Sequence, residues 1–470
     1  MNSVLPPDRL TLAQAARLIR ARRLSPVELM ESCLARIEQF EPHVNAFATM
    51  TAESALAGAR HAETEIAGGV WRGPLHGIPV GIKDVIDVSG VPTRAQSRQM
   101  EDYVPLRNAA SVARWLDAGA LSLGKLTTHE FAFGSPDPAL PRPPARNPWH
   151  TAHFAGGSSS GAAVGVACGM VLGALGSDTA GSVRSPAALC GMSGFKPGRA
   201  CVNRRGTLAL APSLDALGVI AGSVEDCAML FLALVEPAVQ RVVGVDISGY
   251  PQLDAEVRGL RIGVVRNFFD DEPSVNTDCR AAVDAARMIF EDAGYTLTEV
   301  SLPPLAQWHA AGMVILLAEA FALHEYWLRT RIDLYGRSFS DAVLLGAAIS
   351  AADYVHAVQM RRALTVDLDA TMGKCDLLLA PIQAGEAPLL GALSQWGFLQ
   401  RPSYGLPFNL SDNPALSLCC GFGKTGLPLA MQLIGRRGSE GSVLRAGYAY
   451  QRRTDWHRRL HLSGKPRSLN

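Results

Sequence analysis

The residues most able to do chemistry lie in a segment between residues 156 and 198 that is rich in glycine, serine and alanine. Within it, Ser182 is flanked by small residues in the run Gly-Ser-Asp-Thr-Ala-Gly-Ser at 176–182. Such surroundings leave a hydroxyl exposed beside backbone NH groups that are free to stabilise a developing oxyanion. The segment therefore predicts a serine nucleophile for acyl transfer.

A serine nucleophile needs a base, and Lys83 is the best candidate. It follows an apolar, strand-like run at 78–82, which is an unusual place for a surface lysine. Its ordinary pKa near 10.4 must fall by roughly three units for it to act at pH 7, at about 1.4 kcal/mol per unit, and burial can supply such a shift. We therefore expect Lys83 to be buried and largely neutral.

Other interpretations of the small-residue segment fit less well. The run GGSSSGAAVG at 156–165 lacks the Gly-Lys-Ser/Thr ending of a P-loop, and no GxGxxG opens a helix after a strand. The residues around Ser158 are close to a GxSxG nucleophile elbow in composition, but those before them, 146–153, are polar and broken by proline. A flexible linker would have no need of Asp178 or Arg184, so we expect a packed segment whose small residues let backbones approach closely.

Several further motifs occur in a fixed order along the chain. They are 77–83 (GIPVGIK), 130–135 (EFAFGS), 146–149 (RNPW), 194–197 (GFKP), 213–215 (SLD), 224–226 (VED), 407–410 (PFNL) and 426–435 (GLPLAMQLIG). In these stretches and in the block at 156–198, the chain resembles the amidase signature family over nearly its whole length.

The resemblance implies a role for each matching residue. Lys83 would be the base, Ser158 a bridging serine on a cis peptide bond, and Ser182 the acylated nucleophile, in one continuous hydrogen-bonded line. The NH groups of Thr179, Ala180, Gly181 and Ser182 would form the oxyanion hole. Ala180 stands where the family usually has a glycine, and its methyl group is expected to narrow the pocket. No metal or organic cofactor is implied.

The expected function is hydrolysis of amide C–N bonds other than peptide bonds, through an acyl-enzyme on Ser182. Aryl or alkyl amides are the expected substrates, with esters and carbamates (urethanes) open to the same tetrahedral route. An amidase subunit of a tRNA-dependent amidotransferase is the alternative, and an inactive binding module is disfavoured because all three reactive residues are present.

Substrate-binding residues are expected mainly in one short stretch. It comprises Phe131, Ala132, Phe133 and Gly134. More distant aromatic residues could line an apolar pocket, although core packing is the ordinary role of each: Trp149, Phe154, Trp396 and Tyr404. The histidines His129, His150 and His153 are interpreted as structural or surface residues, and Glu130 as a carboxylate that ties down loop backbone.

The predicted fold class is α/β, a single large domain with a mixed, mostly parallel β-sheet covered by helices on both faces. Helical patterns at 11–22, 25–39 and 52–67 precede strand-like runs, which lie at 78–82, 121–124, 171–176, 260–265, 377–379, 416–418 and 429–434. We expect one domain over 1–470, with N-terminal helices (about 1–70), a signature core (about 71–235), a helical cap (about 270–372) and C-terminal strands and a helix (about 373–470).

Composition narrows the partners. The net charge is +1 and no five like charges run together, so we expect neither a nucleic-acid partner nor an anionic membrane surface. The nine cysteines are scattered without a CxxC pair, which argues against zinc and disulfides and favours a reducing cytoplasm. We see no signal peptide and no membrane-spanning run. The expected partner is a small-molecule amide, bound by a monomer or homodimer.

Overall fold

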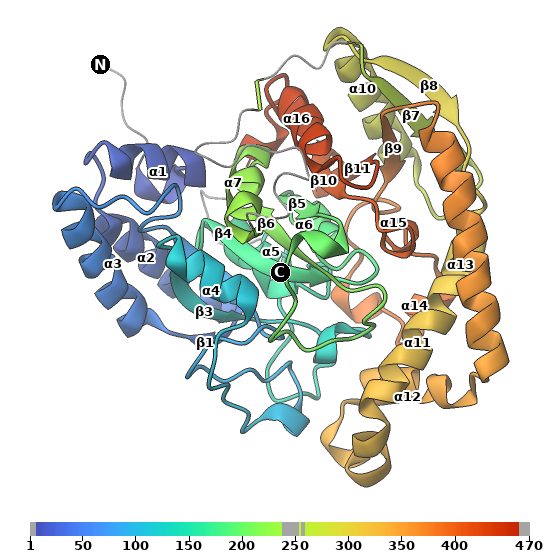
Figure 1. Cartoon of the computed structure of the whole chain (residues 1–470), viewed down its shortest axis with the longest axis horizontal. Coiled ribbons are helices and arrows are strands. Elements are labelled where there is room, and N and C mark those ends of the chain that lie inside the picture. The colour runs from blue at the N-terminus through green and yellow to red at the C-terminus, as the bar shows by residue number, and fades with distance from the viewer. Residues whose placement is uncertain (1–5, 237–252, 255–258, 460–470) are drawn as a thin grey trace.

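Eleven strands form one sheet in the part of the chain that the computed structural model describes, residues 6–236, 253–254 and 259–459 (Figure 1). Their order across the sheet is β1-β3-β2-β4-β6-β5-β10-β11-β9-β7-β8. The strands are β1 Phe47–Met50, β2 Pro79–Lys83, β3 Leu121–Leu126, β4 Gly173–Asp178, β5 Ser193–Lys196, β6 Ala216–Ala221, β7 Arg261–Val265, β8 Thr296–Val300, β9 Leu377–Pro381, β10 Ala415–Phe422 and β11 Pro428–Gly435. The expected α/β class with a mixed sheet is confirmed.

The expectation of a mostly parallel sheet is wrong. Four neighbouring pairs are parallel, namely β2 with β3 and β4, and β7 with β8 and β9. The other six pairs are antiparallel. Part of the reason is that β10 and β11 are joined by the short turn at 423–427, and so short a connection permits only antiparallel pairing. Two strands of this antiparallel centre, β5 and β6, also lie in segments that the sequence patterns did not mark as strands.

Helices surround the sheet. They are α1 Leu12–Arg20, α2 Pro26–Val44, α3 Ala52–Ala67, α4 Ala110–Asp117, α5 Ser160–Ala167, α6 Arg184–Leu189, α7 Val224–Leu234, α9 Asn267–Asp270, α10 Thr277–Asp292, α11 Leu305–Thr330, α12 Arg337–Leu344, α13 Ala351–Met372, α14 Gly397–Gln400, α15 Leu406–Leu410 and α16 Glu440–Gln451. Helices α5 and α6 contact one another and the central strands, and α7 and α16 form a second contacting pair on those strands.

The N-terminal helices begin where the sequence places their caps. The Thr11 side chain accepts a hydrogen bond from the NH of Gln14, and Ser25 caps α2 with Pro26 in its first turn. Helix α2 runs five residues beyond the predicted end near Gln39, and it stops at Asn45, whose φ of 54° is left-handed. A strand, β1, follows it, although the pattern between 1 and 70 predicted helices alone.

The cap is smaller than predicted. The stretch at 270–372 was expected to be a helical insertion, but it includes α10, which packs on β10 and β11, and the edge strand β8. Three helices, α11, α12 and α13, are inserted between β8 and β9 and lie to one side of the sheet (Figure 1, yellow to orange). Among the single helices described, α11 alone is long and apolar enough to span a membrane, and half of its most apolar stretch is buried. It packs against α12, α13 and α15.

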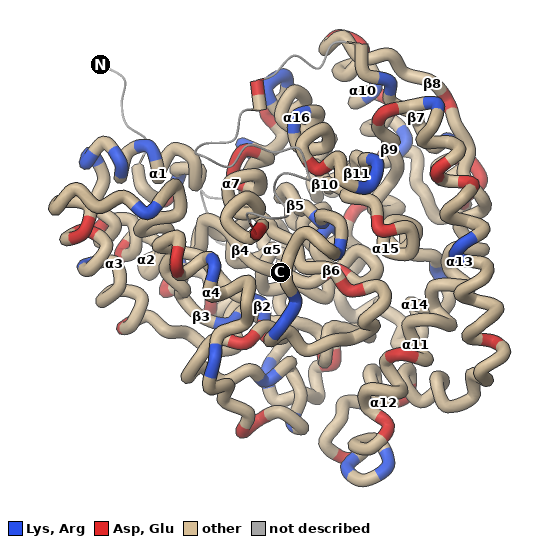
Figure 2. Tube along the Cα trace, in the orientation of Figure 1, with Lys and Arg blue, Asp and Glu red and all other residues tan. Residues whose placement is uncertain are grey.

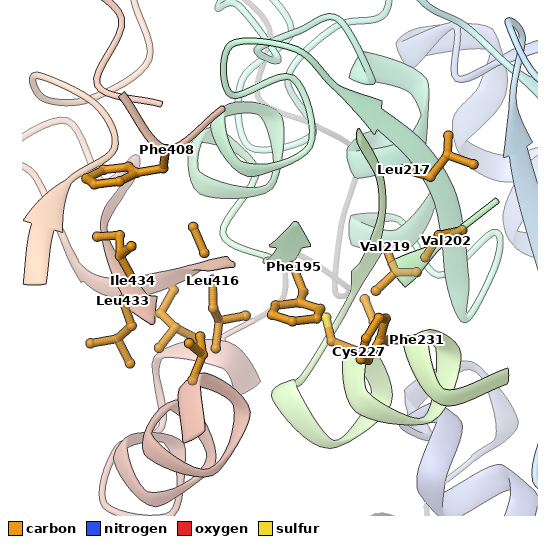
Figure 3. Packing of buried hydrophobic residues seen from close by; sticks show 14 of the residues in the cluster. Phe195, Val202, Leu217, Val219, Cys227, Phe231, Phe408, Leu416, Leu433 and Ile434 are labelled. Carbon is orange, nitrogen blue, oxygen red and sulfur yellow. The ribbon is translucent and has the colours of Figure 1, made fainter. Parts of the chain in front are cut away.

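The hydrophobic core is continuous across the central strands (Figure 3). Phe195 of β5 lies between Leu416 of β10 and the side chains of α7, and its ring meets that of Phe231 edge-on at 5.1 Å. Both phenylalanines are fully buried. Burial of each such ring stabilises the fold by roughly 1.5–3 kcal/mol, so this packing holds β5, β10 and α7 together near the centre of the sheet.

Both signs of charge are scattered over the chain. In Figure 2, Lys and Arg and also Asp and Glu occur on most parts of the described trace, although α1 carries arginines and no acidic residue. This distribution agrees with the net charge of +1.

Candidate active site

Lys83 stands at the carboxyl end of β2, beside the end of the parallel strand β4. The register pairs Ile82 with Leu175, which brings the next residues of both strands to the same edge of the sheet. There the Lys83 Nζ lies 2.9 Å from the Ser177 Oγ and 3.4 Å from the Ser177 carbonyl oxygen. Lys83 is fully buried, as expected from the sequence.

Ser158 completes the surroundings of the lysine. Its Oγ lies 2.7 Å from the Lys83 Nζ, and its side chain is 2% exposed. The bond between Gly157 and Ser158 is cis, which confirms that prediction. Two residues later α5 begins, and it packs between strands so closely that a Cβ on Gly161 would lie 2.3 Å from the Ala46 carbonyl oxygen. A small residue is therefore required there, as the sequence indicated.

The electrostatics of this cluster favour a neutral amine. Burial lowers the pKa of Lys83 from 10.5 to about 7, although the carboxylates of Asp178 and Asp215 act in the opposite direction. A lysine with this pKa is half deprotonated at neutral pH. It can then accept a proton from the Ser158 hydroxyl, which lies within hydrogen-bond distance.

Ser182 lies on the loop that connects β4 to α6, and it is partly exposed. Its carbonyl oxygen accepts a hydrogen bond from the NH of Ser159 at 3.1 Å, which ties the two serine-bearing loops together. Within the described residues, no hydrogen bond joins the Ser158 and Ser182 hydroxyls, so the predicted continuous line is closed only between Lys83 and Ser158. Hydrogen bonds of this kind commonly tighten only when substrate binds.

The backbone NH groups of the same loop divide into two sets. Thr179, Ala180 and Ser182 donate their NH groups to no protein atom in the described structure, so these donors are available to a ligand. The NH of Gly181, which was predicted to belong to the oxyanion hole, instead donates to the Asp178 Oδ1 at 2.8 Å. The NH of Gly181 is therefore not free to bind an oxyanion.

Asp178 and Arg184 support the loop that carries Ser182. Both are fully buried, and the Arg184 Nε and Nη2 donate to the Asp178 carboxylate at 3.0 and 2.9 Å. Burial alone would raise the pKa of Asp178, but the Arg184 guanidinium outweighs it and holds that pKa well below its ordinary range. Arg184 also donates to Gln432 of β11 and Asn409 of α15 at 2.8 and 2.7 Å. The motifs 407–410 and 426–435 thus support the loop rather than the reaction directly.

A cavity of about 500 Å³ opens onto Ser158 and Ser182. Its near wall is the stretch 132–136, which begins at the last residue of the short 3-10 helix Glu130–Ala132. Its far wall is one face of α11, with His309, Met313 and Leu316 at helical spacing. Residues 392–404 complete it. Of the residues that line it in the described structure, Arg401 is the one charged side chain, and none is acidic.

Comparison with known proteins supports what the geometry suggests. Residues 28–444 match the family model described as Amidase. The chain belongs to the amidase signature family. It is 39% identical over 480 residues to a protein from Chloroflexus aggregans that is named as a glutamyl-tRNA(Gln) amidotransferase subunit, with 96% of this chain and 97% of that one covered.

Solved amidase structures share the fold throughout. A crystal structure of an amidase is 32% identical, with a TM-score of 0.84 and coverage of 94% of this chain and all of that one. Native peptide amidase from Stenotrophomonas maltophilia is 27% identical, with a TM-score of 0.83 and coverage of 98% and 100%. The chain is thus an amide-bond hydrolase of this family. The relative from Chloroflexus aggregans is named as one subunit of a larger enzyme, which weighs against the expected monomer or homodimer acting alone.

The predicted pocket residues of this amidase fall into two groups. Ala132, Phe133 and Gly134 line the cavity, as do Phe154 and Tyr404. Phe131 does not line it, because its ring packs at 4.5–5.6 Å against three rings of the cap, His324, Tyr335 and Phe339. Trp149 packs on Phe422 at 5.1 Å, and Trp396 is 37% exposed and lies outside the cavity lining.

Polar residues near the amidase cavity were predicted less completely from the sequence. Glu130 ties down backbone as predicted, accepting from the NH of Gly336 at 2.9 Å and from the Ser97 hydroxyl at 2.6 Å. His129 lines the cavity, and Ser177 contacts Lys83, but neither was singled out as functional. The SD pair at 177–178, beside a predicted strand end, is the signal that could have marked Ser177.

The possible metal ligands and the cysteines of the described residues are arranged as follows. No three His, Cys, Asp or Glu side chains gather there in a way that could hold a metal ion. All nine cysteines are buried and free, and burial raises the pKa of Cys33, Cys168 and Cys419 to about 12. Those three thiols are therefore protonated at neutral pH.

Proposed function

We propose that this chain hydrolyses carboxamides through an acyl-enzyme on Ser182, with Lys83 as the base and Ser158 as the proton relay. The observation that carries the proposal is the buried contact of 2.7 Å between the Lys83 Nζ and the Ser158 Oγ, beneath the cavity that Ser182 also lines. A neutral amine in this position withdraws a proton through one hydroxyl from another.

The reaction follows from the positions of these groups. The Ser182 Oγ attacks the amide carbon and passes its proton to Ser158, which passes its own to Lys83. The free NH groups at 179, 180 and 182 stabilise the oxyanion that forms. The tetrahedral intermediate then collapses, the C–N bond breaks, and the proton returns through Ser158 to the leaving nitrogen. Water repeats the cycle on the acyl-enzyme and releases the carboxylic acid.

The cavity supports an uncharged amide with an apolar acyl or leaving group. Met313, Leu316, Phe133, Phe154 and Phe398 supply apolar surface to its walls. A cationic substrate would lose its hydration without gaining a carboxylate, because the described lining contains no acidic side chain. Aryl and alkyl amides, esters and carbamates satisfy these conditions.

A second candidate is the amidase subunit of a tRNA-dependent amidotransferase. It is favoured by 39% identity across nearly the full length of a protein with that name. Such a subunit would release ammonia from an amide donor for a partner to use. If free glutamine were that donor, its ammonium group would require a negative partner that the described cavity lining does not contain.

Two measurements test the proposal. A fluorophosphonate probe should label Ser182 in the wild-type protein, and Ser182→Ala should lose both the label and at least about 1,000-fold in kcat/KM towards nitroanilides, as loss of a nucleophile does. The same purified chain should then be given glutamine and a neutral aryl amide. Turnover of the aryl amide alone supports the hydrolase, whereas release of ammonia from glutamine, stimulated by a partner, would replace it with the second candidate. Unchanged activity in Ser182→Ala would refute both.

A further inference from the structure

The imidazole of His129 lies between the wall of the cavity and the cis-serine segment. Its Nδ1 is 2.8 Å from the carbonyl oxygen of Gly134, a residue that lines the cavity. Because a carbonyl oxygen can only accept, the Nδ1 carries the proton and donates it. One edge of the ring is therefore anchored to the substrate-binding stretch.

The Cε1–Nε2 edge of the same ring lies against Gly157. A Cβ built on Gly157 would lie 2.1 Å from the Cε1 and 2.3 Å from the Nε2 of His129, so the ring and the glycine backbone are in close contact. The backbone NH of His129 also donates to the Ser158 carbonyl oxygen at 3.3 Å. The histidine thus touches both residues of the cis peptide whose serine contacts Lys83.

The ring is neutral in this position. Burial lowers the pKa of His129 to about 4, the Gly134 carbonyl opposes that shift, and the nearby Lys83 adds to it. Above about pH 5 the imidazole therefore places no second positive charge beside the lysine.

We propose that His129 is a positioning residue with two separable functions, an inference that depends on the proposed serine mechanism. Its ring keeps the Gly157–Ser158 segment where the Ser158 Oγ meets the Lys83 Nζ, which governs the chemical step. Its Nδ1 proton keeps the Gly134 stretch of the cavity wall in place, which governs substrate binding.

Two substitutions separate these functions. In His129→Asn, the side-chain amide can still donate to Gly134, but nothing reaches Gly157, so kcat should fall about tenfold while KM stays within about twofold. In His129→Met, a flexible chain can fill the space beside Gly157 but has no NH donor, so KM should rise about fivefold while kcat stays within about threefold. A purely structural role would lower both parameters together in both variants.

His153→Asn is the matched control. The His153 Nδ1 makes the same kind of bond, 2.6 Å from the Ala387 carbonyl oxygen, but His153 does not line the cavity. Its substitution should leave kcat and KM within about twofold of the wild type. Thermal unfolding of all three variants measures how much stability each change removes.

The inference is overturned if His129→Asn keeps the wild-type kcat, or if the two His129 variants change kcat and KM in the same proportions. That outcome differs from failure of the proposed function. If Ser182→Ala still turns over substrate, the serine mechanism itself is wrong. If Ser182→Ala is inactive and fluorophosphonate still labels both His129 variants, a missing split between kcat and KM rejects the role of His129 alone.

Discussion

Replacing Lys83 with methionine should abolish turnover and at the same time stabilise the protein. The lysine is fully buried, and no carboxylate lies within ion-pair distance of its Nζ in the described structure. Its folded pKa of about 7 stands below the ordinary value of 10.5 because burial disfavours the charged form. Burial in the folded protein therefore disfavours the protonated amine, which lowers the free energy of unfolding at pH 7. Methionine, which has a similar length and no charge, removes this penalty.

The size of the effect follows from the two pKa values. The fall from 10.5 to about 7 corresponds to a penalty of about 4 kcal/mol at pH 7, at about 1.4 kcal/mol per pH unit. Methionine also removes the hydrogen bonds to Ser158 and Ser177, which contribute about 1 kcal/mol each. The net gain for Lys83→Met is then about 2 kcal/mol at pH 7.

The pH dependence has a definite sign. Between pH 7 and 10.5 the unfolded chain keeps the lysine proton that the folded protein has released, so the wild-type free energy of unfolding rises with pH. Methionine does not titrate. The advantage of Lys83→Met over the wild type should therefore shrink by about 2 kcal/mol from pH 7 to pH 9.

Urea denaturation followed by the fluorescence of the seven tryptophans measures this difference. Lys125→Met is the matched control, because Lys125 is equally buried but lies 3.0 Å from the Asp84 carboxylate. Its loss leaves that carboxylate unpaired and should destabilise the protein by about 3 kcal/mol. If Lys83→Met is less stable than the wild type at pH 7 and the difference does not change with pH, Lys83 is charged in the folded protein and the reasoning fails.

Three further predictions follow from the same geometry. The kcat/KM for a neutral amide should rise with pH through about 7, falling about tenfold per unit below it as Lys83 gains a proton, and a flat profile from pH 5 to 8 would contradict the role of the lysine. Ser177→Ala removes the second hydroxyl on the Lys83 amine and should lower kcat about tenfold in steady-state assays, whereas an unchanged kcat would limit Ser177 to packing. Arg184→Met leaves the buried Asp178 carboxylate without its hydrogen-bonded partner and should cost about 3–5 kcal/mol in urea denaturation, so a loss below about 1 kcal/mol would show that the pair does not hold the loop.

Strands that carry continuous apolar residues were predictable from the sequence. The runs at 78–82 and 260–265 correspond to β2 and β7 within one residue at each end, because strands buried on both faces are apolar throughout. Strands β5 and β6 were missed. Strand β6 (ALGVIA) is as apolar as β2 and was overlooked, whereas β5 (SGFK) is four residues long with Phe195 as its one large apolar side chain, buried by neighbours far away in the chain. The strand propensity of a short segment does not reveal which distant residues will cover it.

The site residues that stand in recognisable motifs were predictable from the sequence. Those that reach the site only because two distant strands pair were not. Lys83, Ser158 and Ser182 stand in recognisable runs, and burial of the lysine followed from its place after an apolar strand. The contact between Lys83 and Ser177 depends on which strand pairs with β2, which no local pattern shows. The far wall was hidden for the same reason, because the spacing of Met313 and Leu316 predicts a helix face but not the cavity it meets.

The insertion of the cap between β8 and β9 places the residues that shape the cavity and the residues that carry out the reaction in different parts of the sequence. The groups that contact the reacting bond in the proposed mechanism all lie between Lys83 and Ser182, whereas the distant walls of the cavity come from α11 and from residues 382–404. Mutations at Met313 and Leu316 of α11 alter the volume and polarity offered to a substrate while the lysine and the serines keep their places, whereas Ser403, whose hydroxyl donates to the Ala180 carbonyl oxygen at 2.6 Å, also supports the loop that carries Ser182. A lineage with this architecture can exchange one amide for another in small steps and retain a working bond-cleaving centre throughout.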